Sequence, residues 1–151
     1  MIDHRITRIV DVNLNRLTEG LRVVEDLVRF GMGRPRLLSS IRSLRTRVGK
    51  ETRSLRRSAI LSRDSESDPG RGDRFDRARR RSLDDILMAN FKRAEEACRV
   101  LEEALKVEDS ASAAKFKAVR FRLYDLEKAA VEASRVKGHR ARGKGQSEEK
   151  R

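Results

Sequence analysis

NRLTEGLRVVED, residues 15–26, and KRAEEACRVLEE, residues 92–103, are two versions of one short and highly charged segment. They begin 77 positions apart in a chain of 151 residues. Six residues in and beside each copy keep the same identity and order. Asn13, Arg16, Glu19, Arg22, Val23 and Glu25 of the first copy match Asn90, Arg93, Glu96, Arg99, Val100 and Glu102 of the second. The repetition indicates that one structural unit is used twice.

Apolar residues in both copies recur at helical spacing. The first copy has Val10, Leu14, Leu17, Leu21, Val24 and Val28, and the second has Leu87, Phe91, Ala94, Cys98, Leu101 and Leu105. Alternating steps of four and three place each set on one face of a helix. Further helices are predicted at about 36–58 and 113–136, where LRTRV (44–48) resembles VRFRL (119–123). We therefore predict an all-α bundle made of two helical hairpins related by pseudo-twofold symmetry.

Local signals set the ends of these helices. Gly31 and Gly33 are expected to end the first helix, and SRDSESDPGRGDR (62–74) is predicted to be a loop because Asp, Ser, Pro and Gly cluster there. Ser82 is a predicted N-cap of the third helix. The bundle domain is expected to cover residues 1–133. Residues 134–151 lack periodic apolar residues and are expected to form a disordered basic tail.

Charge dominates the composition: 40% of residues are charged and the net charge is +13. The surplus lies mainly in residues 34–81 and in the tail, which suits a phosphorylated or polyanionic partner. No apolar run is long enough to span a membrane, and no secretory signal is visible, so a cytoplasmic location is expected. An apolar stripe can also form a dimer seam, so the sequence leaves a homo-oligomer open.

The repeated polar residues allow two interpretations. In the first, Arg16, Glu19, Arg22 and Glu25 form a solvated ladder of i,i+3 ion pairs, each contributing about 0.2–0.5 kcal/mol. In the second, they contact a ligand. Asparagine is unfavourable inside a helix, so its recurrence calls for a local reason such as a cap, a cross-helix hydrogen bond or a ligand.

Other polar candidates lie outside the repeat. In the loop, Arg63 supplies charge for a phosphate, while Asp64 or Asp68 is placed to reach a Mg²⁺ ion. Tyr124 is the only tyrosine, and it suits either a polar site or core packing.

Long stretches of the chain resemble one family. RIVDVNLNRLTEGLRVVEDLVRF (8–30) resembles the opening of the helical domain fused N-terminally to some bacterial thiamine-phosphate synthases. ANFKRAEEACRVLEE (89–103) and VRFRLYDLEK (119–128) are similar to later motifs of that domain, and SRDSESDPG (62–70) stands where it has a loop. The resemblance covers roughly residues 5 to 130.

The resemblance implies a noncanonical kinase that uses ATP and Mg²⁺ to convert hydroxymethylpyrimidine phosphate to the diphosphate. Phosphoryl transfer depends mostly on positioning and charge neutralisation. We expect the candidate side chains to converge on a cleft between the hairpins. The catalytic candidates are Arg22, Arg99, Glu19 and Glu96. The substrate-binding candidates are Asn13, Arg16, Asn90, Arg93, Arg63, Arg120, Arg122 and Tyr124. The metal-binding candidates are Asp64 and Asp68.

The sequence departs from the family pattern in places. Pro69 replaces a residue that would supply a backbone N–H, and Phe121 stands at a usual tyrosine. A synthase barrel is absent, so we expect a stand-alone copy with a separate thiamine-phosphate synthase as a partner. One alternative is a non-catalytic helical adaptor for that synthase. The other is a basic nucleic-acid-binding protein, which the scarcity of aromatic residues, 4%, disfavours.

Overall fold

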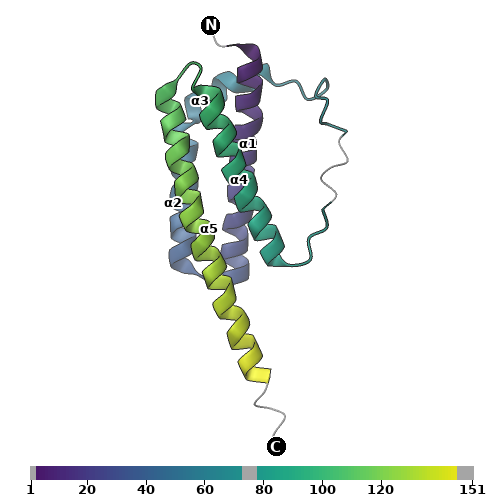
Figure 1. The fold of residues 1–151 in the computed structure, drawn as a ribbon, viewed down its shortest axis with the longest axis vertical. Helices are drawn as coiled ribbons and strands as arrows, with labels where there is room; N and C mark the ends of the chain where they lie inside the picture. The colour runs from purple at the N-terminus through teal and green to yellow at the C-terminus, as the bar shows by residue number, and fades with distance from the viewer. Residues whose placement is uncertain (1–2, 73–77, 146–151) are drawn as a thin grey trace, which may run out of the picture.

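The computed structural model describes residues 3–72 and 78–145 (Figure 1). The elements are α1 (His4–Asp26), the π-helix η1 (Leu27–Met32), α2 (Pro35–Glu51), α3 (Arg53–Ala59), the 3₁₀-helix η2 (Ile60–Ser62), α4 (Leu83–Leu105) and α5 (Ser110–Gly145). Every regular element within these residues is helical, which confirms the predicted all-α bundle.

The long helices lie side by side (Figure 1). α1 packs against α4, and α4 packs against α5, while α2 contacts both α1 and α5. After η2, residues 63–72 run outside the bundle, and α5 extends past its lower end (Figure 1). This layout places one loop beside α1 and leaves the outer faces of α2 and α5 open.

The two predicted apolar stripes form most of the core. All twelve of their residues are buried, and Ile41, Leu44 and Val48 of α2 join them. Cys98 is one of these core residues, and burial raises the pKa of its thiol to about 12. The interior is therefore filled mainly by aliphatic side chains, together with Phe91, Phe116 and Cys98.

α1 and α4 approach each other closely at Gly20. A Cβ atom built at this position would lie 3.0 Å from the backbone carbonyl oxygen of Asn90 and 3.5 Å from the Cβ of Ala94. A carbonyl oxygen cannot rotate away as a flexible side chain can. Position 20 thus sets how close the two helices come.

The helix ends follow the predicted chemistry in part. The Ser82 hydroxyl accepts a hydrogen bond from the Asp85 backbone N–H at 3.1 Å, which confirms the N-cap. After Asp26 the first helix widens into η1 and ends at Gly33, whose φ of 63° is the left-handed conformation that glycine adopts readily.

Two predicted helices have different limits. The predicted helix at 36–58 is interrupted at Thr52, whose buried hydroxyl donates to the Val48 carbonyl at 2.7 Å. The fourth helix begins early, because Asp109 accepts a hydrogen bond from the backbone N–H of Ser112. It continues to Gly145, inside the segment expected to be a disordered tail. Residues 73–74 of the predicted loop and 146–151 of the tail lie outside the described residues, and the boundary at 133 stays a prediction.

Candidate functional site

A surface cavity of about 320 Å³ lies between α1 and the loop after η2. Its lining residues are Arg8, Asp11, Val12, Asn15, Arg16, Glu19, Arg63, Asp64, Ser65 and Asp68. The members from α1 are spaced by three or four, so they share one face of the helix. Arg16, Glu19, Arg63, Asp64 and Asp68 are sequence candidates that the structure brings together here.

Asp11 and Arg63 fix the loop to the helix. The Nε and Nη2 atoms of Arg63 donate to the two carboxylate oxygens of Asp11 at 2.7 and 2.9 Å. The Asp11 residue is only 2% exposed, so this carboxylate is almost fully removed from water. Its hydrogen bonds and charge raise the pKa of the Arg63 guanidinium. The pair uses two of the five guanidinium N–H groups and leaves three for a ligand.

Short-range contacts hold the rest of the loop. Arg8 donates to the backbone carbonyl of Asp64 at 2.9 Å. The carboxylate of Asp64 accepts hydrogen bonds from the hydroxyl and the backbone N–H of Ser67, which lower its pKa. Asp68 accepts from the backbone N–H of Gly70 at 2.8 Å. The Asp64 carboxylate therefore remains ionised near neutral pH beside the cavity.

Hydrogen bonds from α3 support the part of α1 that lines the cavity. Arg56 donates to the side-chain oxygen of Asn15 at 2.9 Å and to the hydroxyl of Thr18 at 3.1 Å. Arg16 stands between these supported positions, and it forms no hydrogen bond or ion pair with the described part of the chain. Its guanidinium is thus available to an anion.

The cavity combines two ligand chemistries. Guanidinium groups bind phosphate oxygens through paired hydrogen bonds. The cavity has three such groups, from Arg8, Arg16 and Arg63. Carboxylates suit Mg²⁺, which commonly takes one or two from the protein and the rest of its ligands from phosphates and water. Across residues 3–72 and 78–145 no group of three or more metal-binding side chains occurs. The donor set therefore fits a metal held jointly with a bound phosphate.

The expected cleft between the hairpins does not form among the described residues. The apolar stripes fill the space between α1 and α4, and six of the eight repeated charged residues lie on the outside. The exposed set is Arg16, Glu19, Arg22, Arg93, Glu96 and Arg99. A helix with a buried apolar face turns its polar residues outward. The expectation of convergence was wrong for this reason.

The remaining arginine candidates have structural partners. Arg22 lies 3.6 Å from Asp26, and Arg99 lies 3.0 Å from Glu103. Arg120 donates to Glu102 at 2.7 Å and to the Tyr124 hydroxyl at 3.1 Å. These residues do not line the α1 cavity.

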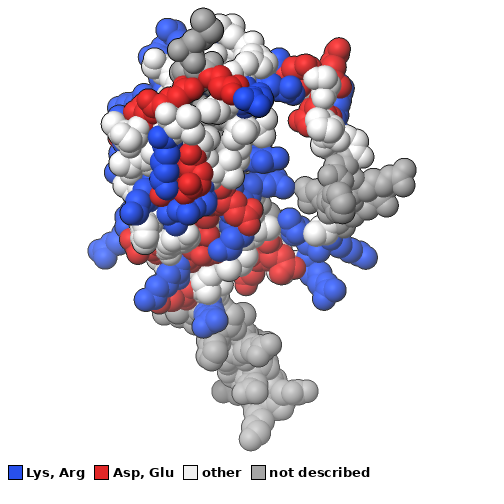
Figure 2. All heavy atoms as spheres, turned by 45° about the horizontal axis from the view of Figure 1, so that its top comes forward, with Lys and Arg blue, Asp and Glu red and all other residues white. Residues whose placement is uncertain are grey.

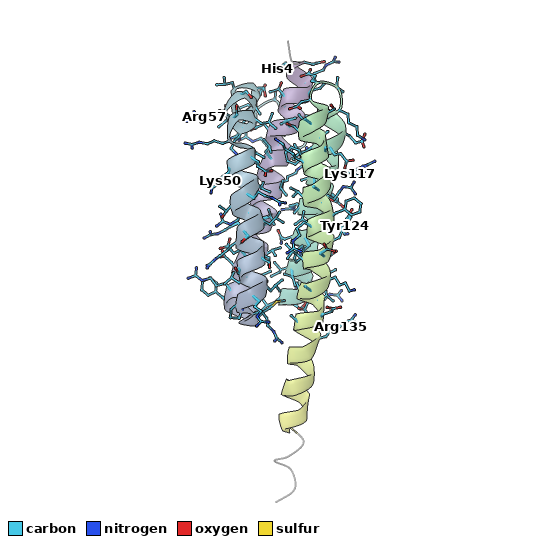
Figure 3. All side chains as sticks on the ribbon, turned by 90° about the vertical axis from the view of Figure 1, so that its left-hand side faces the viewer. His4, Lys50, Arg57, Lys117, Tyr124 and Arg135 are labelled. Atoms are coloured by element: carbon cyan, nitrogen blue, oxygen red, sulfur yellow. The ribbon has the colours of Figure 1, made fainter. Side chains whose placement is uncertain are left out.

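The α5 candidates lie elsewhere on the bundle. Tyr124 and Lys117 follow one another along α5, across from Lys50 of α2 (Figure 3). The Tyr124 ring makes an edge-on contact with Phe121 at a centroid distance of 5.7 Å. Arg122 lines a separate hollow between α2 and α5.

The two repeated asparagines have one local explanation. The Asn13 side-chain amide donates to the Ile9 carbonyl at 2.9 Å, and that of Asn90 donates to the Ile86 carbonyl at 2.8 Å. Each amide thus bonds back to the preceding turn of its own helix. This contact accounts for their place in both helices, while the predicted role in ligand binding stays a prediction.

The buried glutamates of the repeat were not among the predicted site residues. Glu25 accepts hydrogen bonds from Arg42 at 3.0 Å and from Arg45, and Glu102 accepts one from Arg120. The Arg120 hydrogen bond is the main cause that lowers the pKa of Glu102. The sequence shows that Glu25 and Glu102 recur at equivalent positions. Their partners could not be predicted from it, because those arginines lie on other helices. Both contacts tie one helix of a hairpin to the other.

These features define a class of protein, a helical bundle with a surface cavity that mixes guanidiniums and carboxylates. The chain belongs to the ThiD2 family, because the sequence model of that family matches residues 8–129. This match confirms the resemblance that was predicted from residues 8–30 and the later motifs.

Three similar proteins are all named thiamine-phosphate synthase. The one from Synechococcus sp. (strain CC9605) is 40% identical over 134 residues, which cover 88% of this chain and 37% of that protein. The one from Parasynechococcus marenigrum (strain WH8102) is 39% identical over 93% of this chain and 40% of its own length. The one from Gloeobacter violaceus (strain ATCC 29082 / PCC 7421) is 41% identical over 83% and 36%.

The chain thus spans about two fifths of the curated relatives it matches. No solved structure matches it. In the part of the chain that the structure describes, no helix has the length and apolar character needed to cross a bilayer.

Proposed function

We propose that this protein acts in thiamine biosynthesis in the cytoplasm, where it phosphorylates hydroxymethylpyrimidine phosphate with ATP and Mg²⁺. Membership of the ThiD2 family and the names of the relatives support the pathway. The observation that carries the proposed reaction is the α1 cavity, where three guanidiniums and four carboxylates meet.

The proposed reaction moves one phosphoryl group. A phosphate oxygen of the substrate forms a bond to the γ-phosphorus of ATP, and the bond between that phosphorus and the bridging oxygen breaks. The products are the pyrimidine diphosphate and ADP. Both reactants are anionic, so the chief tasks of the protein are to bring them together and to offset their charge.

The cavity residues divide these tasks by charge. Arg16 and the free N–H groups of Arg63 would bind phosphate oxygens, and Arg8 would add a third positive charge. Asp64 and Asp68 would hold Mg²⁺, which supplies charge neutralisation at the phosphates. Glu19 lies close enough to Arg63 to act on its charge, so it would position that guanidinium.

Thiamine-phosphate synthase is the partner we propose, since the relatives that carry this name match the chain over only part of their length. Nucleic acid is a less well supported candidate for a partner. Over the face shown in Figure 2, Lys and Arg are interspersed with Asp and Glu, whereas nucleic-acid binding favours a continuous basic stripe.

The direct test follows ADP formation by the purified chain with hydroxymethylpyrimidine phosphate, ATP and Mg²⁺. Turnover that needs both the pyrimidine phosphate and Mg²⁺ is the expected result. Arg16→Gln should lower kcat/KM by about tenfold or more, because a guanidinium–phosphate contact is lost.

Arg57→Gln is the matched control, because Arg57 is another exposed arginine with no ion pair or hydrogen bond among the described residues. It lies on α3, away from the lining of the cavity (Figure 3). Absence of turnover in the folded wild-type protein would overturn the proposed activity. Equal effects of the two substitutions would remove Arg16 from the site.

A further inference from the structure

A second hollow, of about 330 Å³, lies between α2 and α5, which run side by side in Figure 3. It is lined by Ser39, Ser40, Ser43, Leu44, Arg47 and Arg122. None of these residues lines the α1 cavity. The lining contains two guanidiniums, three hydroxyls and no carboxylate, so its charge differs sharply from that of the first site.

The geometry follows from helical spacing. Ser39, Ser43 and Arg47 are four residues apart, which places them in one row along α2. Arg122 comes from α5 and faces that row across the hollow. A ligand between the helices would therefore meet cationic and hydroxyl groups from two walls.

The two arginines lack effective counter-charges. Arg47 forms no ion pair or hydrogen bond with the described residues. Arg122 has one ion-pair contact, with Asp125 at 4.0 Å, and the two side chains are 47% and 74% exposed, so water screens this pair. By contrast, Arg42 and Arg45 on the same helix are paired with Glu25. Two like charges around one hollow repel each other unless an anion lies between them.

We propose that this hollow is a second anion site, which binds the phosphate group of a small phosphorylated molecule. Guanidiniums and serine hydroxyls are both donors to phosphate oxygens, and the fork of an arginine matches two of them. The volume is at the lower end for small-molecule sites, so it accommodates a phosphate or diphosphate with a small attached group.

A neighbouring surface offers room for the rest of such a molecule. A larger hollow along the outer face of α2 shares Ser39, Ser43 and Arg47 with the anion site and continues to Pro35 and Leu38. The phosphate would bind between the arginines while an attached ring lay against these apolar side chains.

Isothermal titration calorimetry of the full chain with inorganic pyrophosphate tests the site. All measurements use the Arg16→Gln background, which weakens binding at the α1 cavity. Arg47→Gln and Arg122→Gln should each raise the dissociation constant by about tenfold. Arg57→Gln should leave it within about twofold. Melting curves of each variant establish that the fold is intact, as expected for exposed side chains.

Unchanged affinity in Arg47→Gln and Arg122→Gln would overturn the proposal, as would an equal loss in Arg57→Gln. A second titration with ATP separates the possible sources of the phosphate. Binding of ATP tighter than pyrophosphate, and dependent on Arg122, assigns the site to a nucleotide, whereas equal affinity assigns it to the phosphate group alone. The titrations involve no turnover, so they succeed or fail independently of the kinase assay.

Discussion

Arg63 donates hydrogen bonds to both carboxylate oxygens of Asp11, and this pair holds the loop after η2 against α1. The two residues are 52 positions apart, and Asp11 is buried whereas Arg63 is partly in water. The pair shapes the α1 cavity, because it fixes the position of Asp64 and of the loop that follows.

Asp11→Ala should destabilise the protein by about 1–3 kcal/mol, because two hydrogen bonds to a charged group are lost. Urea denaturation at pH 7 measures this free energy. In the Asp11→Ala background, Arg63→Gln should add no further loss, since the two residues act as one unit. Additive effects of the two substitutions would show that the ion pair contributes nothing of its own.

Gly20→Ala should destabilise the bundle by about 1–3 kcal/mol, since the new methyl would press on the carbonyl oxygen of Asn90. Gly49→Ala is the matched control, because it lies inside α2 with nothing within 4 Å of the added atom. It should stabilise the protein by about 0.5–1 kcal/mol through helix propensity alone. Thermal or urea unfolding of both variants checks the opposite signs, and a stabilising Gly20→Ala would contradict the close approach of α1 and α4.

Glu102→Gln should cost about 1–3 kcal/mol at pH 7, because it weakens the buried contact with Arg120. The native pKa of Glu102 is lowered from 4.5, chiefly by that hydrogen bond. Its stabilising contribution is therefore complete above pH 4.5 and is lost as the pH falls through the lower native pKa. The difference between wild type and variant, measured by urea unfolding across this range, should shrink on acidification; a constant difference would contradict the charge-based explanation.

Glu95 should show the opposite pH dependence. Burial is the main cause that raises its pKa above 4.5, and nearby Glu127 raises it further, while Lys92 offsets part of the effect. Oε1 of Glu95 and Oε1 of Glu127 are both buried without a hydrogen-bond partner in the described structure. Stability linked to Glu95 is present below pH 4.5 and is lost as the pH rises through its native pKa.

Glu95→Gln should therefore be more stable than wild type at pH 7, by about 1 kcal/mol or more, and the gain should vanish near pH 4. Lys92→Gln provides the contrast, because it removes the offsetting cation and should lower stability at pH 7. Denaturation curves at the two pH values measure both changes, and a destabilised Glu95→Gln at pH 7 would contradict the raised pKa.

The fold was predictable because it rests on periodicity. The positions from Val10 to Val28 and from Leu87 to Leu105 fix which face of each helix is buried, whatever the neighbouring helix is. The Ser82 cap was predictable for a similar reason, since it depends on residues three apart.

The candidate site was predictable only in part. Arg16 and Glu19 share the cavity with the 63–68 loop, but periodicity does not tell where a loop returns to the bundle. The ladder interpretation failed at Glu25 for the same reason. Its hydrogen-bond partners are Arg42 and Arg45 of α2, and not the preceding turn of its own helix. Contacts between distant segments depend on packing that local spacing does not encode.

The close approach to α4 at Gly20 makes that position the point about which α1 would pivot. The α1 cavity lies toward one end of the helix, and Glu25, with its two arginines, lies toward the other. A larger side chain at position 20 would tilt α1, and a tilt moves the two ends of a helix in opposite directions. A substitution at Gly20 would therefore disturb the cavity wall and the Glu25 ion pairs together, although Gly20 belongs to neither group.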